Sequence, residues 1–181
     1  ASKVVVCTTD VTDCFWVTVD AFNIAEEDQT PVLILSDQFI GHRTEIVEPF
    51  DLSKLRVAER KKPTEAELAA VDKRHGFARF AYTADHVSPM SVPGMAGGSY
   101  LNSGLEHDTI GAPASGVAGH QKMTEKRWKK LDAVAEGYRH LTVVAGDPDA
   151  EIGIMAWGSC KGAVLEAVQQ LQDQGVKVRA V

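Results

Sequence analysis

The sequence has 181 residues, of which 44% are hydrophobic and 24% charged. This is the composition of an ordinary folded protein, so disordered and collagen-like chains are excluded. Nineteen lysines and arginines against 25 aspartates and glutamates give a net charge of −6, which argues against nucleic acid as the main partner because phosphate binding needs a cationic surface. No apolar run reaches the roughly 18–20 residues that cross a bilayer. We therefore expect a cytoplasmic protein with neither a membrane nor a nucleic-acid partner.

The sequence contains three cysteines, Cys7, Cys14 and Cys160. An odd number without a Cys-x-x-Cys spacing supports neither a disulfide framework nor an iron–sulfur or zinc site within the chain. We expect each cysteine to be a small buried side chain, and we predict no metal site.

The first part of the chain predicts a β-α-β unit. Residues 3–8 are rich in β-branched side chains and are typical of a buried strand. A helix follows, capped by Thr9 or Asp10, and its apolar residues recur on one face: Val11, Phe15, Val19 and Phe22. Pro31 ends this helix. Residues 31–35 then form an apolar run without alternation, which is typical of a parallel strand covered on both faces.

The middle of the chain is predicted to be less regular. Thr64 and Glu67 form a capping box for a short helix that ends near Gly76. Residues 88–119 are rich in glycine, proline and serine, and a loop of this length in a compact protein is normally functional or a linker. Residues 120–138 predict a second helix, with an apolar face made of Met123, Trp128, Leu131 and Val134.

The last third repeats the pattern of the first. Residues 151–157 predict a strand and residues 158–162 a tight turn. The helix that follows ends at Gly175 and leads into a strand over residues 176–181; its predicted buried stripe is Val164, Leu165, Val168 and Leu171. The predicted fold is α/β, with two partial parallel-sheet units joined by a long linker. Because buried-type strands lie at both ends of the sequence, we expect each end to be the cut edge of a larger sheet, protected by another chain or by a second copy.

Three ordered stretches carry a resemblance to a known family. They are residues 29–38 (QTPVLILSDQ) with 47–51 (VEPFD), residues 88–94 (SPMSVPG) leading into 102–108 (NSGLEHD), and residues 156–167 (AWGSCKGAVLEA). In this order and spacing they resemble the alpha subunit of 2-oxoacid:ferredoxin oxidoreductases, most closely the 2-oxoglutarate type. The resemblance covers nearly the whole chain.

The resemblance implies an enzyme complex that oxidatively decarboxylates a 2-oxoacid such as 2-oxoglutarate with coenzyme A, giving an acyl-CoA, carbon dioxide and reduced ferredoxin. Thiamine diphosphate carries this chemistry. The resemblance also implies a beta subunit that supplies the diphosphate and Mg²⁺ site and a [4Fe–4S] cluster, and a homo-oligomer of the resulting heterodimer. We expect this chain alone to be inactive and to bind none of these groups.

The same resemblance divides the chain into three parts. Residues 1–50 correspond to the C-terminal part of a pyrimidine-side domain, residues 51–140 to a linker with short helices, and residues 141–181 to the N-terminal part of a transketolase C-terminal-like domain. The family's Tyr-Pro-Ile-Thr-Pro stretch and its activating glutamate lie before this segment. The family usually has arginine after Ser-Pro, where this chain has Met90, so an anion contact made by that arginine would be lost.

Glu106, His107 and Asp108 are the most chemically suggestive neighbours in the sequence. All three side chains can exchange protons, and the flanking Gly104 and Gly111 permit close approach of a ligand. They are our catalytic candidates. The alternative is structural: the two carboxylates cap backbone groups of a folded linker and His107 bonds to a carbonyl group.

Three further residues are candidates for cofactor binding. Ser159 and Lys161 lie in the turn between a strand and a helix N-terminus, where backbone N–H groups can hold an anion such as a phosphate or coenzyme A. Asp37 follows a parallel strand, at the edge where α/β sheets bind ligands. The structural alternatives are a tight turn for the first two residues and a helix cap for Asp37.

The predicted helix over residues 120–138 carries a basic run, which is typical of a solvated face and otherwise of a docking site for an acidic partner. The run consists of Lys122, Lys126, Arg127, Lys129 and Lys130. For the whole chain, the alternative to an oxidoreductase subunit is a non-catalytic scaffold or small-anion-binding module derived from the same family. That alternative rests on the missing catalytic stretch and on Met90.

Overall fold

The computed structural model describes residues 3–72 and 74–181, which form two compact units. The sheet unit comprises Lys3–Asn23, Pro31–Val57 and Gly137–Val181. The loop unit comprises Ile24–Thr30 and Ala58–Glu136. No helix in the described part of the chain has both the length and the apolar composition that a bilayer crossing requires.

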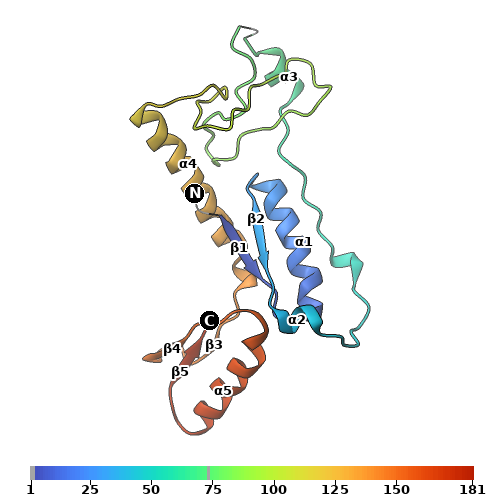
Figure 1. The fold of residues 1–181 in the computed structure, drawn as a ribbon, viewed down its shortest axis with the longest axis vertical. Helices are drawn as coiled ribbons and strands as arrows, with labels where there is room; N and C mark the ends of the chain where they lie inside the picture. Colours follow the sequence, from blue (N-terminus) through green and yellow to red (C-terminus); the bar gives the residue numbers. More distant parts are fainter. Residues whose placement is uncertain (1–2, 73) are drawn as a thin grey trace. The chain divides into compact units, whose positions relative to one another are not determined.

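The sheet unit begins with the predicted β-α-β arrangement (Figure 1). β1 (Val4–Cys7) and β2 (Val32–Leu35) are parallel and are connected by α1 (Val11–Glu27). The Asp10 carboxylate accepts a hydrogen bond from the Asp13 backbone N–H at 2.8 Å and caps the first turn of α1. Val6, Val17 and Ala21 form the buried core between helix and strands, with Val4, Val32 and Leu141 packed against it.

The face through which α1 packs on the strands differs from the predicted one. Val17 and Ala21 are buried, whereas Phe22 is 69% exposed. The smaller side chains let the helix approach the strands closely, and the bulky stripe predicted from the sequence lies elsewhere on the helix. Phe15 of that stripe instead stacks on Phe50, with ring centroids 4.2 Å apart.

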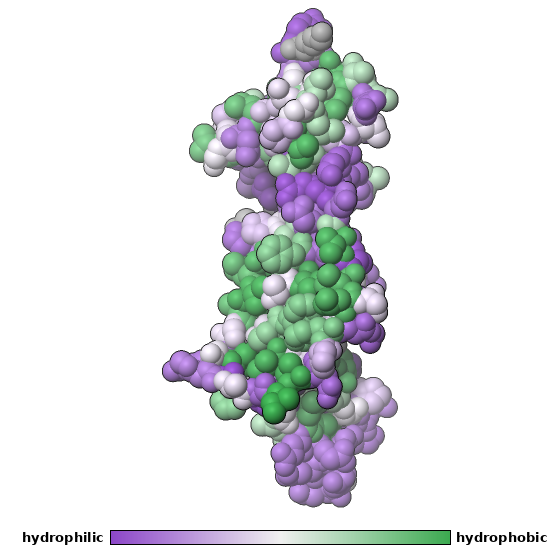
Figure 2. All heavy atoms as spheres, turned by 90° about the vertical axis from the view of Figure 1, so that its right-hand side faces the viewer, coloured by the Kyte–Doolittle hydropathy of each residue, from purple (hydrophilic) through white to green (hydrophobic). Residues whose placement is uncertain are grey.

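Much apolar surface of the sheet unit stays exposed. β2 was expected to be covered on both faces, but Leu33, Ile34 and Leu35 are exposed. Leu33 and Leu35 lie on the face opposite α1, which a single helix leaves uncovered, whereas Ile34 shares the helix-side face with Val32 and is still partly open. In Figure 2 apolar side chains also gather over α1 and the segment that follows β2. The exposed residues there include Phe22, Phe39, Ile46 and Leu52.

The C-terminal part of the sheet unit forms a second small layer. β4 (Ile152–Ile154) and β5 (Val178–Ala180) are parallel, and β3 (Ala145–Gly146) pairs antiparallel with β5, giving the order β3-β5-β4. α5 (Lys161–Asp173) covers one face and buries Val168, Val178 and Ala180. The predicted strand–helix–strand order is confirmed. Within the predicted buried stripe of α5, Val168 is buried but Leu165 is exposed.

Short helices complete the sheet unit. They are α2 (Gln38–His42) and the 3₁₀ helices η1 (Leu52–Lys54), η2 (Arg139–Leu141) and η3 (Gly158–Cys160). η3 runs directly into α5 and is the tight turn predicted before that helix. Gly175 ends α5 as predicted, with a φ of +79°.

The loop unit contains α3 (Glu65–Ala69), which opens with the predicted capping box. Thr64 Oγ1 accepts the Glu67 N–H at 3.2 Å, and the Glu67 carboxylate accepts the Thr64 N–H at 2.7 Å. The helix ends before the predicted Gly76, because the Asp72 carboxylate accepts the Arg74 N–H in a local turn that competes with the helix. The following loop contains one isolated bridge, between residues 107 and 113.

α4 (Val117–Gly137) is the second predicted helix, but its buried face is partly basic. Met123 and Val134 are buried as expected, whereas Trp128 is 53% exposed. Lys126 and Lys130 take half-buried positions on the helix. The basic run is therefore not simply a solvated face. Long lysine side chains can cover apolar surface with their stems while the ammonium groups find oxygen partners.

The α/β class with parallel strands is confirmed. The division into three parts at residues 50 and 140 stays a prediction.

Candidate functional site

The ends of β1 and β2 define one edge of the sheet unit. Because these strands are parallel, their carboxyl ends lie at the same edge, where open α/β sheets bind ligands. Thr9 and Asp10 follow β1, and Asp37 follows β2. We call this set, together with Ser159 and Lys161, the carboxyl edge.

Asp37 caps α2, as its structural alternative predicted. The Asp37 Oδ1 atom accepts the Ile40 backbone N–H at 3.0 Å. The Oδ2 atom accepts the Ser159 backbone N–H at 2.8 Å. These hydrogen bonds lower the pKa of Asp37 below its ordinary value, with that from Ile40 contributing most and those from Ser159 next. The side chain is therefore a carboxylate at neutral pH.

Lys161 lies at the same edge through a different contact. Its ammonium donates a hydrogen bond to Thr9 Oγ1 at 3.2 Å. The Thr9 hydroxyl and backbone N–H in turn donate to Asp13 Oδ2 at 2.8 and 2.9 Å. The three predicted cofactor-binding residues, Asp37, Ser159 and Lys161, are thus brought together, and whether they contact a cofactor stays a prediction. The neighbouring Cys160 is exposed rather than buried, with its thiol donating to the Trp157 carbonyl at 2.8 Å.

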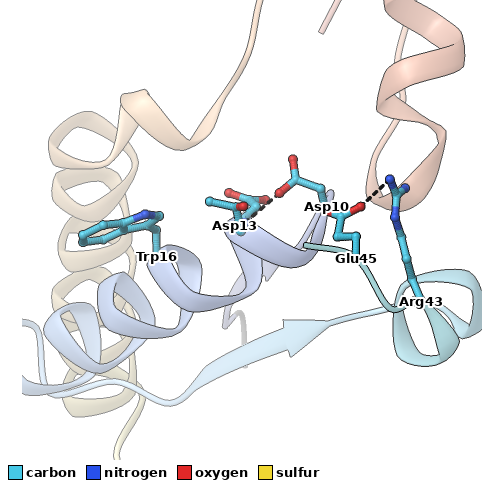
Figure 3. Close-up of a pocket in the computed structure, with 6 residues that line it drawn as sticks. Asp10, Asp13, Trp16, Arg43 and Glu45 are labelled. Atoms are coloured by element: carbon cyan, nitrogen blue, oxygen red, sulfur yellow. Dashed lines mark hydrogen bonds and ion pairs between the residues drawn. The ribbon is translucent and has the colours of Figure 1, made fainter. Parts of the chain in front are cut away.

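A shallow pocket of about 460 Å³ adjoins this edge at the start of α1 (Figure 3). It is lined by Asp10, Thr12, Asp13, Trp16, Arg43 and Glu45. Arg43 and Glu45 form an ion pair at 2.5 Å, and the carboxylates of Asp10 and Asp13 leave the wall negatively charged. Arg43 and Glu45 could not be predicted from the sequence as lining residues, because nothing in their local pattern connects them with the start of α1.

Glu106 is held by α4. The Glu106 carboxylate accepts two hydrogen bonds from Arg127, at 2.9 and 3.2 Å, and lies 2.7 Å from His120 Nδ1. The hydrogen bonds from Arg127, followed by that of His120, lower the pKa of Glu106 to about 2. A carboxylate held in this way is a poor proton acceptor at neutral pH.

His107 and Asp108 also make contacts that build the loop. The His107 ring lies against Phe80, with centroids 3.9 Å apart, and Nδ1 is 3.2 Å from the Asp108 carbonyl oxygen. Asp108 Oδ1 accepts the N–H groups of Ile110 and Ala112, both at 3.0 Å. The observed contacts follow the structural alternative for both residues. A catalytic role for Glu106, His107 and Asp108 stays a prediction. These contacts connect the three side chains to the loop and to α4 rather than to one another.

Lys126 belongs to the basic run that the sequence predicted to be a solvated face, but its ammonium is partly buried and fully hydrogen-bonded. Its ammonium donates to the carbonyl oxygens of Phe80, at 3.0 Å, and Ala81, at 2.8 Å, and to Ser88 Oγ. Burial lowers the pKa of Lys126 to about 8. All three donors have acceptors, so this lysine fastens the loop to α4. Its spacing of three residues from the buried Met123 was the signal that could have revealed it.

Met90 stands where the family usually has arginine, and another arginine lies beside it. Arg60 Nη1 is 3.0 Å from Met90 Sδ. The same guanidinium donates to both carboxylate oxygens of Glu26, at 2.9 and 2.8 Å. A cation therefore remains near position 90, although its charge is paired.

The His, Cys, Asp and Glu side chains decide whether the chain could hold a metal ion. Among residues 3–72 and 74–181, no three His, Cys, Asp or Glu side chains gather in a way that could hold a metal ion. Asp10 and Asp37 of the carboxyl edge, and the nearby Asp13, each accept hydrogen bonds from within the chain. The edge can therefore position polar groups, but the described residues do not form a metal centre.

Comparisons with known proteins connect this geometry to a family. Residues 1–126 match the family described as "Pyruvate flavodoxin/ferredoxin oxidoreductase, thiamine diP-bdg". The chain is 31% identical to a 2-oxoacid:ferredoxin oxidoreductase subunit alpha of Saccharolobus solfataricus, covering 97% of the chain and 27% of that protein. It is also 31% identical to the 2-oxoglutarate synthase subunit KorA of Methanothermobacter marburgensis, covering 92% of the chain and 42% of that protein.

The solved structures give the same result. A 2-oxoglutarate:ferredoxin oxidoreductase from Magnetococcus marinus, with 2-oxoglutarate, coenzyme A and succinyl-CoA bound, matches with a TM-score of 0.81 and 33% identity. The match covers 98% of this chain and 30% of that one. This chain thus spans less than half the length of these relatives. The resemblance found in the sequence is confirmed, and the chain belongs to the pyruvate flavodoxin/ferredoxin oxidoreductase thiamine-diphosphate-binding family.

Proposed function

We propose that this chain is part of the alpha subunit of a 2-oxoacid:ferredoxin oxidoreductase. The complex would convert a 2-oxoacid such as 2-oxoglutarate and coenzyme A to an acyl-CoA, carbon dioxide and reduced ferredoxin. The observation that carries the proposal is the likeness, over 98% of the chain, to an oxidoreductase with 2-oxoglutarate, coenzyme A and succinyl-CoA bound. The family that matches residues 1–126 of this chain is described as thiamine-diphosphate-binding, which supports the same reaction class.

In this proposal the chain contributes positioned polar groups rather than a complete active site. The carboxyl edge is held in place by Asp37, which bonds to α2 and to the η3–α5 turn. The contact of Lys161 with Thr9 adds a second tie. Such mutual support fixes side chains before a ligand arrives, which is what a site shared between subunits requires.

The thiamine diphosphate site would be completed elsewhere. Bound thiamine diphosphate supplies a nucleophilic carbon and an electron sink for decarboxylation. Its diphosphate requires Mg²⁺ with oxygen ligands at set positions, and the described residues offer no such cluster. They therefore do not fit that end of the cofactor. We assign the diphosphate, the Mg²⁺ and a [4Fe–4S] cluster to a beta subunit, in an oligomer of heterodimers that also receives ferredoxin and coenzyme A.

The domain assignment belongs to the same proposal. Residues 1–50 would be the C-terminal part of a pyrimidine-side domain, residues 51–140 a linker, and residues 141–181 the N-terminal part of a transketolase C-terminal-like domain. The exposed apolar residues of β2, Leu33, Ile34 and Leu35, support this assignment, because a strand of this composition is normally covered by further layers.

The test is an assay of the complex that contains this chain. A tagged chain is produced in its native cells and purified with its bound partners, and reduction of methyl viologen is measured with 2-oxoglutarate or pyruvate. We expect reduction that requires both a 2-oxoacid and coenzyme A, and bound thiamine diphosphate in the purified complex. A control without coenzyme A separates the full reaction from simple decarboxylation.

The main alternative makes a different forecast. A scaffold or small-anion-binding module would give a purified complex that contains the chain but reduces no acceptor with any 2-oxoacid. That result, obtained with thiamine diphosphate and iron present in the complex, would overturn the proposed function.

A further inference from the structure

One carboxylate, that of Asp37, lies at the start of two helices at once. Its Oδ1 caps α2, which begins at the next residue, and its Oδ2 accepts the Ser159 N–H in η3, 122 residues away in sequence. Neither η3 nor α5 has a side-chain cap from its own N-cap residue, Trp157 or Cys160. Asp37 therefore supplies the capping group that the local sequence of this turn lacks.

The η3–α5 turn is shaped to receive this carboxylate. Gly158 has a φ of +74°, and a Cβ atom at that position would lie 2.8 Å from Asp37 Oδ2. A side chain at position 158 would meet the carboxylate as well as adopt a backbone conformation that favours glycine. Lys161 of the same turn bonds to Thr9, so a second contact holds the turn at the end of β1.

The electrostatics of the turn explain why an anion belongs there. The N–H groups at a helix N-terminus carry a partial positive charge and bind phosphates and carboxylates. In this chain the anion is already present, because the Asp37 carboxylate accepts N–H groups at the start of both helices, and these hydrogen bonds lower its pKa. The position at which the sequence predicted contact with a phosphate or coenzyme A is filled by a carboxylate of the chain itself.

We infer that Asp37 is an intramolecular anion that latches the η3–α5 turn to the carboxyl end of β2 and keeps the turn closed to free anions. An anionic ligand reaches the Ser159 N–H only by displacing Asp37. This inference goes beyond the proposed reaction, because it concerns a contact within the chain and stands whether or not the complex oxidises a 2-oxoacid.

Asp51 provides the comparison that separates a latch from an ordinary cap. It caps η1 by accepting the Ser53 N–H at 3.1 Å and the Ser53 hydroxyl at 2.6 Å. Both partners lie two residues away, so this cap stabilises only its own turn. Asp37 differs because half of its hydrogen bonding serves a distant segment.

The experiment follows individual amides in the full 181-residue chain by NMR. Asp37→Gly removes the carboxylate and keeps a residue that is tolerated at the N-cap of α2. We expect hydrogen exchange of the Ser159 amide to become about tenfold faster or more, as for the loss of a hydrogen bond to a charged group. Added acetate or inorganic phosphate should then shift the Ser159 resonance and restore part of its protection in the variant, but not in the unchanged chain.

The matched control is Asp51→Gly, which should expose the Ser53 amide and leave Ser159 unaffected. The latch is refuted if acetate and phosphate shift the Ser159 resonance of the unchanged chain as strongly as that of Asp37→Gly. It is also refuted if Ser159 exchange is the same with and without Asp37. If Asp37→Gly does not fold, the test uses the unchanged chain. As acid is added, the Asp37 carboxyl resonance and the Ser159 amide resonance should shift with the same midpoint. Different midpoints refute the latch.

Discussion

The Glu106–Asp108 triplet and the η3–α5 turn both place polar groups beside glycines, but they are used in opposite ways. In the triplet, Asp108 bonds to N–H groups two and four residues away, and Glu106 bonds to one neighbouring helix. In the turn, Ser159 and Lys161 bond to segments more than 120 residues away in sequence. The residues of the triplet, although adjacent in sequence and chemically reactive, thus stabilise a local loop. Ser159 and Lys161 instead make contacts with segments that are distant in sequence. Long-range convergence is the better sign of a functional edge.

The triplet loop is expected to break most severely at Gly111. A Cβ atom there would lie 1.8 Å from the Leu101 carbonyl oxygen, and the φ of +88° favours glycine. Gly111→Ala should lower the free energy of unfolding by about 2–6 kcal/mol, because backbone strain and overpacking each cost about 1–3 kcal/mol. Urea unfolding measures this. Gly104→Ala, with no atom within 4 Å of the added Cβ, is the control, and an equal loss in both variants would contradict the argument.

The second expected effect concerns the fastening of this loop to α4. Lys126→Met removes the Lys126 donor from the Phe80 and Ala81 carbonyl oxygens, of which Ala81 keeps the Ser88 hydroxyl as a donor. Losing the donor to Phe80 should cost about 1–3 kcal/mol. Lys129→Met is the control, because Lys129 pairs with Glu125 at the surface and the loss of this pair should cost about 0.3–0.5 kcal/mol. Unfolding in urea at pH 7 compares the two variants.

Lys126 also makes a forecast for alkaline pH. Burial lowers the pKa of its ammonium from 10.5 to about 8 in the folded chain. Between these two values the unfolded chain binds more protons, so this group makes the folded state more stable as pH rises. The stability difference between the unchanged chain and Lys126→Met should therefore grow from pH 8 to pH 10. A difference that stays constant over this range would show that the ammonium is not desolvated.

A smaller effect is expected at Glu106. Its pKa of about 2 lies below the ordinary 4.5, so its contribution to stability is present above pH 4.5 and is lost as pH falls toward 2. Glu106→Gln should cost less than about 1 kcal/mol at pH 7, as for other accessible ion pairs. Thermal unfolding between pH 2 and pH 7 should show the two chains converging at low pH. Persistence of the difference at pH 2 would assign it to packing.

The smallest expected signal comes from the cofactor. Titration of the isolated chain with thiamine diphosphate and Mg²⁺ in a calorimeter should show no binding tighter than about 1 µM, which is roughly 8 kcal/mol. The reason is that the carboxyl edge offers no metal-binding cluster in the described residues. Saturable binding below that concentration would mean that the chain holds a complete site.

The sequence predicted the order of the elements better than their contacts. Residues 3–8 and 31–35 contain the strands β1 and β2, and Thr64 with Glu67 opens α3, because β-branched runs and capping boxes act locally. The choice of helix face was less predictable. Phe22 and Trp128 are apolar enough for a core but are exposed, since the face that packs is chosen by the neighbouring element rather than by the helix.

The candidate site was predictable in its residues and not in its connections. Asp37, Ser159 and Lys161 could be named from strand ends and a helix start. No local pattern could show that Asp37 bonds to Ser159, because that pairing depends on how two separate β-α segments are placed together. Arg43 and Glu45 were missed for the same reason.

The open face of β2 has a consequence for the life of the chain in the cell. Leu33 and Leu35 are exposed on a strand whose composition suits a buried layer, and exposed apolar strands readily pair with other chains. Whatever covers this face will also stabilise the folded state by mass action. The amount of folded chain should therefore rise and fall with the supply of its covering partner, so that unassembled copies are removed by proteases or aggregate rather than accumulate.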